Sequence, residues 1–240
     1  MIDVHSHIIP GVDDGSKSIE DTFNMILEAK EIGFTDIMMT SHYMTHNYEP
    51  TTQELTIWKE KLQKLLKTKN VNVKLHCGME IYVTNQIEDL LKEKKLLTLG
   101  ESRYLLMELP INCSINYLDY VVYYLQANSI QLILAHPERY IYVQNNPNLI
   151  NEFIDKGILI QCNYASIIGL YGKKAQKTMK KILKRNQVHF LGSDCHEPNT
   201  TYKQIPQAIK KIKKIIGEDK FYKISTENPK KILNNEELEF

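Results

Sequence analysis

The 240-residue sequence has no apolar run long enough to cross a membrane, and its start lacks the basic and apolar regions of a secretory signal. We therefore expect a cytoplasmic protein without direct membrane insertion. Its 30 basic residues are balanced by 29 acidic residues, and the net charge of +1 gives no global argument for binding nucleic acid or anionic lipid. With no internal repeat and no low-complexity linker, residues 1–240 are expected to form a single domain.

Paired cysteines are also missing. The four cysteines form no CxxC motif, and in a cytoplasmic protein we expect them to be free thiols. Cysteine-dependent phosphatases need an arginine six positions after the nucleophile, but the corresponding positions here hold Val83, Asp119, Ile168 and Thr201. That chemistry is therefore excluded. No GxGxxG or GxxxxGK[ST] motif follows a predicted strand, which argues against a nucleotide-binding fold.

Strand and helix patterns alternate along the chain. Short apolar runs predict strands at residues 2–4, 37–40, 73–79, 104–107, 132–135, 158–161 and 189–192. Amphipathic segments predict a helix from Ser18 to Gly33 and others near residues 52–67, 86–94, 116–128, 148–156, 173–185 and 202–216. Residues 219–240 are expected to hold one or two short helices broken at Pro229. This alternation indicates an α/β protein whose parallel sheet is covered by helices.

Six of the predicted strands end in side chains that commonly bind metal ions. These side chains are His5 with His7, His42, Glu80, Glu108, His136, and Asp194 with His196. Only the strand at 158–161 ends in a weak candidate, Asn163. Parallel strands bring their carboxyl ends to one face, so residues scattered over the sequence should converge there. Convergence from all strands favours a closed barrel, because an open doubly wound sheet would gather ligands only near its switch point.

The strongest local indication of a metal site is His5-Ser6-His7. Side chains two apart on an extended segment point the same way, so both imidazoles can bind one ion, or one each of two neighbouring ions. Asp13 and Asp14 follow between two glycines and could simply form turns; Asp14 is the better candidate ligand.

Carboxylates that end apolar strands are costly to bury unless a cation compensates them, although a buried salt bridge is an alternative. Glu80 and Glu108 are in this position, and either could bridge two ions. The complete set of candidate ligands is His5, His7, Asp14, His42, Glu80, Glu108, His136, Asp194 and His196. That number exceeds the needs of one ion and implies two or three. Ligands of this kind without cysteine suit Mn, Fe or Zn in a hydrolytic site.

The arginine in Ala135-His136-Pro137-Glu138-Arg139 is expected on a loop over this site. Its guanidinium fork fits a phosphate or a carboxylate in a bidentate manner, and a surface ion pair is the alternative.

Seven motifs carry a resemblance to a known family. They are DxHSH at 3–7, PGxDDG at 10–15, SH at 41–42, GxE at 78–80, ELP at 108–110, AHPER at 135–139 and SDxH at 193–196. Together and in this order they resemble the PHP (polymerase and histidinol phosphatase) superfamily. Within it, the chain is similar to the bacterial manganese-dependent tyrosine-protein phosphatases of capsule and exopolysaccharide operons. The resemblance implies a distorted (β/α)7 TIM-like barrel, the PHP fold, with a three-metal site.

The implied reaction is hydrolysis of phosphotyrosine by a metal-bound hydroxide that attacks phosphorus in line. Arg139 would bind the phosphate and stabilise its equatorial oxygens, while His42 or Asp194 could help to protonate the leaving phenolate. The implied partner is the phosphotyrosine-rich tail of a membrane-associated tyrosine kinase that controls polysaccharide export.

Two positions bear on this resemblance. Relatives often carry a phosphate-binding arginine after SDxH, whereas residues 197–203 contain none, and Lys203 is the nearest cation available for substrate. Glu108 stands where histidinol phosphatases tend to have histidine, which favours the tyrosine phosphatase branch. The loop at residues 43–50 could shape the substrate mouth or be a solvated connection.

Three other functions compete with this hypothesis. The first is a small-molecule phosphatase on the same scaffold, such as one for histidinol phosphate. Amidohydrolase-type C–N hydrolysis is the second, but no predicted strand ends in the lysine that those barrels usually carbamylate. The third is a non-catalytic kinase-binding module, against which the intact ligand set argues.

Replacing Cys77 with Ser should leave phosphatase activity nearly intact, because the proposed chemistry uses no thiolate. The check is turnover on a phosphotyrosine peptide with added manganese. A total loss of activity in a folded variant would overturn the metal hypothesis.

Overall fold

A computed structural model describes residues 1–238; residues 239–240, the end of the predicted domain and tail, lie outside the described residues. Seven parallel strands form one sheet whose order follows the chain. The strands are β1 (Ile2–Asp3), β2 (Asp36–Tyr43), β3 (Lys74–Tyr82), β4 (Tyr104–Glu108), β5 (Gln131–Leu134), β6 (Leu159–Asn163) and β7 (Phe190–Gly192). Sequential order with parallel pairing throughout is the topology of a β/α barrel.

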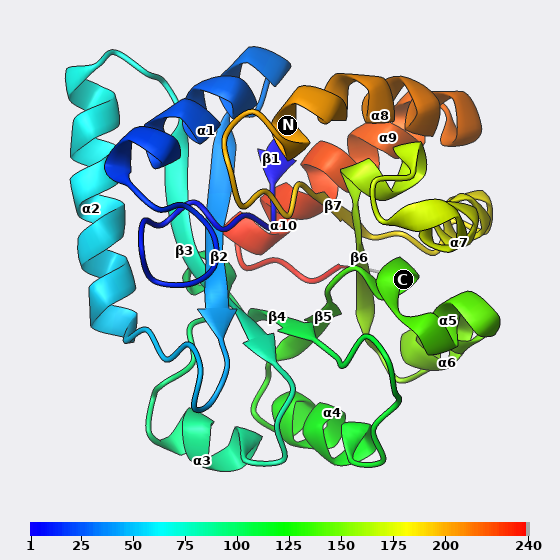
Figure 1. The fold of residues 1–240 in the computed structure, drawn as a ribbon. Helices are drawn as coiled ribbons and strands as arrows, with labels where there is room; N and C mark the ends of the chain where they lie inside the picture. Colours follow the sequence, from blue (N-terminus) through cyan, green and yellow to red (C-terminus); the bar gives the residue numbers. More distant parts are fainter. Residues whose placement is uncertain (239–240) are drawn as a thin grey trace.

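Helices cover the outside of this sheet (Figure 1). The α-helices are α1 (Ile19–Ile32), α2 (Thr52–Thr68), α3 (Ile87–Lys92), α4 (Leu118–Ala127), α5 (Ile141–Asn145), α6 (Leu149–Asp155), α7 (Gly172–Lys184), α8 (Thr201–Ile216), α9 (Glu218–Tyr222) and α10 (Asn228–Leu233). Short 3-10 helices are η1 (Leu99–Glu101), η2 (Pro137–Arg139) and η3 (Tyr164–Ile168), and η4 (Lys223–Glu227) is a short π-helix. Among the described residues, no helix combines the length and apolar character needed to span a bilayer.

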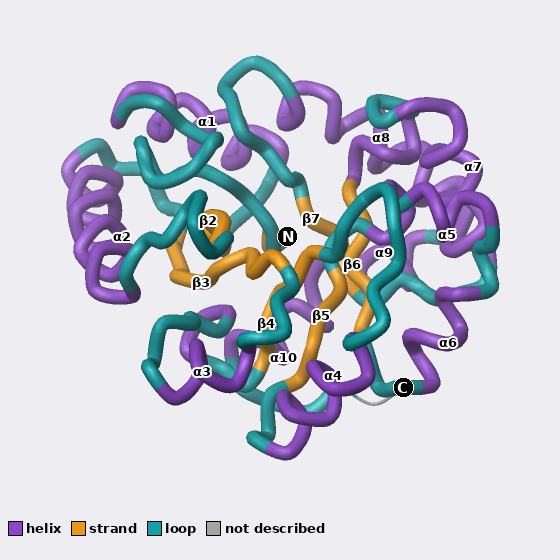
Figure 2. The backbone as a smooth tube through the Cα atoms, turned by 60° about the horizontal axis from the view of Figure 1, so that its bottom comes forward, coloured by secondary structure: helices purple, strands orange, loops and turns teal. Residues whose placement is uncertain are grey.

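The sheet curls until its first and last segments meet, so the barrel is nearly closed (Figure 2). The closure lies just past the short strands β1 and β7. There the His7 N–H donates to the Cys195 carbonyl at 2.9 Å, and the Asp194 N–H donates to the His5 carbonyl at 2.8 Å. The closing hydrogen bonds are therefore made by the backbone of predicted ligand residues.

Apolar side chains fill the barrel from within. The interior cluster includes Val4, Met38, Leu106, Ile133 and Phe190, all buried. Leu99 of η1 and Ile232 of α10 belong to the same cluster and close the end of the barrel that lies opposite the carboxyl ends of the strands. Polar chemistry is therefore confined to the other end, as in other β/α barrels.

The distorted (β/α)7 barrel expected from the sequence is confirmed, and every predicted strand and helix is present within about three residues. The capped first helix agrees in detail, since Ser18 accepts from Asp21 N–H and Gly33 ends the helix in the left-handed region. The predicted break at Pro229 is wrong, because α9, η4 and α10 follow one another without a gap and Pro229 lies inside this helical stretch, just after the wider π-helical turn. Sequence patterns missed α5 and the 3-10 helices, which are too short to show a period.

Candidate metal centre

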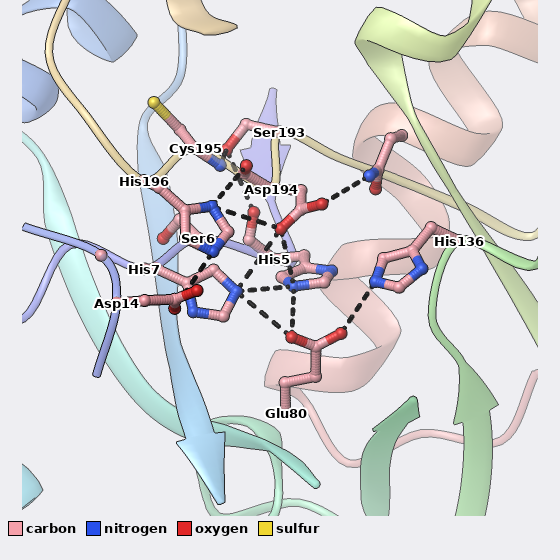
Figure 3. Close-up of polar contacts among 12 residues, drawn as sticks. His5, Ser6, His7, Asp14, Glu80, His136, Ser193, Asp194, Cys195 and His196 are labelled. Atoms are coloured by element: carbon pink, nitrogen blue, oxygen red, sulfur yellow. Dashed lines mark hydrogen bonds and ion pairs between the residues drawn. The ribbon is translucent and has the colours of Figure 1, made fainter. Parts of the chain in front are cut away.

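All nine predicted ligands gather at the carboxyl ends of the strands, and Figure 3 shows seven of them, His5, His7, Asp14, Glu80, His136, Asp194 and His196. The nine come from every strand except β6 and from the loops that follow. Ligand atoms lie within 4.8 Å of one another inside three overlapping groups, which are His7-Asp14-His42-His196, His5-His7-Glu80 and His42-Glu80-Glu108. His136 and Asp194 adjoin these groups through Glu80 and His5, at 2.9 and 3.4 Å respectively.

Glu80 stands at the centre of the cluster. Its Oε2 lies 3.2 Å from the Nε2 atoms of His5 and His7 and 3.1 Å from His42 Nδ1. Burial alone would raise the pKa of this carboxyl group, but the imidazoles of His5 and His42 outweigh burial and hold it well below its usual value. Glu80 is therefore an anion enclosed by nitrogen donors.

Several of these atoms have no hydrogen-bond partner although they are buried. They are Glu80 Oε2, His42 Nδ1 and His136 Nδ1. In addition, the Nε2 atoms of His5 and His7 face each other at 3.0 Å, and such a pair can share only one proton. Buried polar atoms are normally satisfied, so lone pairs that converge without enough protons fit bound cations. The donor set of imidazoles and carboxylates agrees with this interpretation.

Burial and neighbouring charges raise some pKa values in the cluster and lower others. Burial disfavours the charged form of His5, but Glu80 and Asp194 outweigh it and raise the pKa of His5 to about 9. Burial, reinforced by Glu80, raises the pKa of Glu108 to about 8. Burial and the nearby Arg139 lower the pKa of His136 to about 4. Contacts with Asp13 and other carboxylates likewise outweigh burial and raise the pKa of His7 well above its usual value, so without cations the cluster holds protons on the facing His5–His7 pair and on Glu108 at neutral pH.

Two cluster residues have a strained backbone. His136 and Asp194 adopt positive φ angles of 34° and 52°, in a region that non-glycine residues seldom occupy. Each lies two residues past the end of its strand. The unusual turn there directs the side chain toward the cluster. Strain of this kind persists where the surrounding structure enforces it and is concentrated at functional sites.

Asp13, the weaker candidate of the Asp13-Asp14 pair, is a buried partner of two histidines. Its Oδ2 accepts from His7 Nδ1 and from the His42 backbone N–H, both at 2.9 Å. The contact orients the His7 ring so that Nε2 faces Glu80. Asp14 lies closer to solvent, with Oδ1 3.5 Å from His196 Nε2. Only glycine fits at position 15 of this turn, because a Cβ there would lie 2.1 Å from the His7 carbonyl oxygen.

Arg139 lies beside the cluster, as the sequence predicted. Its Nη1 donates to Asp194 Oδ2 at 2.6 Å, and its guanidinium lies 4.5 Å from the centre of the Tyr171 ring. Arg139, Tyr171 and Asp194 line a cavity of about 260 Å³. Its wall is completed by Leu170, His196, Glu197, Thr200 and Thr201. A cationic fork thus faces an open space beside the candidate ligands.

Lys203 does not line this cavity. It lies in α8 with an exposed side chain whose ammonium contacts the Asn199 side chain. Its contribution to substrate binding stays a prediction. In the loop at residues 43–50, Tyr48 stacks against His42 with ring centres 6.1 Å apart, so this loop forms part of the site's surroundings.

The cysteines remain outside the chemistry of the site. All four are free thiols, as predicted. Burial raises the pKa of the Cys77 thiol to about 11 and that of Cys195 to about 12, so neither is a thiolate at neutral pH.

Comparison with known proteins finds relatives over the whole chain. The family described as "Capsular polysaccharide synthesis, CpsB/CapC" matches residues 1–234. Tyrosine-protein phosphatase CpsB of Streptococcus pneumoniae is 31% identical over 97% of this chain and 98% of its own length. Tyrosine-protein phosphatase YwqE of Bacillus subtilis is 29% identical over 99% of this chain and 93% of its own length.

Solved structures agree with these relatives. One from a study of Bacillus subtilis YwqE and Streptococcus pneumoniae CpsB, described as unique metal-dependent tyrosine phosphatases, superposes with a TM-score of 0.94. It is 28% identical, and the match covers 100% of this chain and 96% of that one. A histidinol phosphate phosphatase of Lactococcus lactis reaches a TM-score of 0.54 at 13% identity over 88% of this chain and 93% of that one, a likeness of fold alone.

The affinity of the protein for Mn²⁺ should rise as the pH is raised from about 6 to about 8, because cations must displace protons from His5 and Glu108. Each displaced proton contributes up to about tenfold per pH unit below the pKa of its group. Isothermal titration calorimetry in buffers of different ionisation enthalpy measures both the affinity and the protons released. An affinity that does not change over this range, with no proton release, would contradict this account of the cluster.

Proposed function

Because the chain belongs to the CpsB/CapC family of capsular polysaccharide synthesis, we propose that it is a metal-dependent protein-tyrosine phosphatase that hydrolyses phosphotyrosine. One structural observation carries the proposal, namely the convergence of nine nitrogen and carboxylate ligands on one end of the barrel beside Arg139. The structure described as a metal-dependent tyrosine phosphatase shares this fold nearly completely.

The cluster would hold two or three ions, and Mn²⁺ is the proposed metal, with Fe or Zn as alternatives. Glu80 and Glu108, from neighbouring strands, would be the carboxylates shared between ions. The terminal ligands would be His5, His7, Asp14, His42, His136, Asp194 and His196. Bound cations would supply positive charge against the phosphate oxygens and activate water for attack on phosphorus.

Arg139 is the residue proposed to hold the substrate. One guanidinium N–H is engaged by Asp194, which fixes the side chain, and the group lies on the wall of the cavity. The remaining N–H groups can donate to the equatorial phosphate oxygens, where negative charge is concentrated in the transition state.

His42 and Asp194 are the residues proposed to aid protonation of the leaving phenolate, by orienting a water that gives its proton to the phenolate oxygen and becomes hydroxide. His42 is partly open to solvent, and burial lowers its pKa, so its ring is neutral at neutral pH and can contact such a water without donating its own proton. Tyrosine has a pKa near 10, roughly five units below an alkyl alcohol, and its oxygen leaves with little help from an acid.

A phosphotyrosine-bearing bacterial tyrosine kinase of capsule or exopolysaccharide synthesis is the proposed substrate. The family description and the names of the relatives support this choice. The same proposal locates the enzyme in the cytoplasm, where ATP-dependent kinases act. Histidinol phosphate is the competing substrate, because a histidinol phosphate phosphatase shares the fold at low identity.

Replacing Arg139 with Ala should lower turnover on a phosphotyrosine peptide by about 10²–10³, because the phosphate loses its cationic donor. The Mn²⁺ content should stay the same, since Arg139 contributes no ligand atom. Arg139→Lys keeps a point charge without the fork and should fall between Ala and the parent protein. The measurement is steady-state kinetics together with elemental analysis.

Arg185→Ala is the matched control, because this exposed arginine bonds only Asn148 among the described residues. It should leave turnover unchanged. The parent protein should hydrolyse the phosphotyrosine peptide only with bound metal, and far faster than histidinol phosphate. The reverse preference would replace the proposed function by the small-molecule alternative, and equal activity with and without metal would reject both.

A further inference from the structure

Strand β6 contributes no candidate ligand, yet two amide side chains at its carboxyl end are completely buried. Gln161 and Asn163 lie two residues apart on this strand, so both side chains point into the barrel. Buried amides need partners for every polar atom, and these two find theirs in each other and in two residues of the cluster.

A continuous hydrogen-bonded chain runs from His5 to Asp194 through these amides. His5 Nδ1 and Gln161 Oε1 are 3.0 Å apart, and Gln161 Nε2 donates to Asn163 Oδ1 at 2.9 Å. Asn163 Nδ2 then donates to Asp194 Oδ2 at 2.7 Å. Four residues from three separate parts of the sequence are thereby linked inside the barrel.

Chemistry dictates the direction of every bond in this chain. Asp194 Oδ2 also accepts from Arg139 Nη1 at 2.6 Å, and because a guanidinium can only donate, this carboxylate oxygen is an acceptor toward Asn163 as well. Asn163 must therefore present its NH₂ group to Asp194 and its oxygen to Gln161. Gln161 must in turn direct its NH₂ group to Asn163 and its oxygen to His5. His5 is then left to carry its proton on Nδ1, with the Nε2 lone pair facing the cluster.

We propose that Gln161 and Asn163 are positioning residues that fix the His5 tautomer and the Asp194 orientation together, so that both present ligand atoms to the same point. The inference rests on the metal site of the proposed function. His5 Nε2 and Asp194 Oδ1 lie 3.4 Å apart, while the opposite atoms, His5 Nδ1 and Asp194 Oδ2, are occupied by the chain.

Residues next to these hydrogen-bonded amides leave room for them and hold the end of β6. Gly192 of β7 pairs with Asn163, and a Cβ at Gly192 would lie 2.8 Å from Gln161 Nε2 and 2.6 Å from His5 Cβ. Glu138 accepts from the Asn163 backbone N–H at 2.8 Å and from Ser166 Oγ at 2.6 Å, which fixes the end of β6. A glycine and a buried carboxylate thus leave room for the amides and hold them in place.

The test measures metal affinity in variants that each remove one residue from this series of hydrogen bonds. Gln161→Met and Asn163→Leu replace an amide by an apolar group of similar size. Each should weaken Mn²⁺ binding by about 10–100-fold, as the loss of partners that orient ligands generally does. Because both act through one chain, the double variant should lose little more than either single variant, whereas independent effects would multiply.

A second measurement follows the proton itself. In the Zn²⁺-loaded protein, ¹H–¹⁵N correlation spectra should show a slowly exchanging proton on His5 Nδ1. Asn163→Leu does not alter any contact made by His5, yet it should shift this signal and speed its exchange. An unchanged signal would show that the two ends are not coupled and would overturn the proposal.

Gln187→Met is the matched control, because Gln187 is also a buried glutamine, bonded to Asn151 on another part of the barrel. It should leave Mn²⁺ affinity and the His5 signal as they are in the parent protein. If Gln161→Met does not fold, Gln161→Glu keeps an acceptor for His5 and should retain the Nδ1 proton. A parent protein that binds no Mn²⁺ would reject the proposed function, whereas a parent that binds it no better than the variants would reject this inference alone.

Discussion

The cluster depends on the electrostatic balance around Glu80. A buried carboxylate is tolerated only where opposite charge or hydrogen bonds compensate its lost hydration, and Glu80 Oε2 has three imidazole nitrogens within 3.2 Å. Those imidazoles cannot all be protonated, because the Nε2 atoms of His5 and His7 face each other at 3.0 Å and burial lowers the pKa of His42. Cations satisfy both requirements at once, since they neutralise the carboxylates and use the lone pairs of the rings.

The barrel makes this balance possible because its apolar and its polar interior residues lie in separate regions. Apolar side chains from β1, β2, β4, β5 and β7 fill the middle, and Ile232 and Leu99 close the far end. Only the carboxyl ends of the strands are left for polar groups, and each delivers one or two. The backbone hydrogen bonds that close the barrel are made at His5, His7, Asp194 and Cys195, so the contacts that close the barrel also bring these candidate ligands together.

The convergence of the candidate ligands was predictable from the sequence because nearly all of them follow an apolar strand, where the pattern breaks abruptly. His136 and Asp194 illustrate this, since neither has another reason to stand at the end of a buried strand. The contact of Asp13 with His7 was not predicted, because it depends on a turn that returns Asp13 to His7, and turn geometry leaves no period in the sequence. Gln161 was passed over because a polar residue in a strand gives no sign of its partner, which lies 156 residues away.

The contacts of Arg139 bear on how tightly substrate is held. Its guanidinium is fixed between Asp194 and the Tyr171 ring before any phosphate arrives, so little side-chain entropy is lost on binding. It is also the only arginine lining the cavity among the described residues, and Lys203 stands outside. Asp194 offsets part of its charge. Under the proposed function, recognition of a dianionic phosphate would therefore come mainly from the cations held by the cluster, so that substrate binding would depend on metal loading.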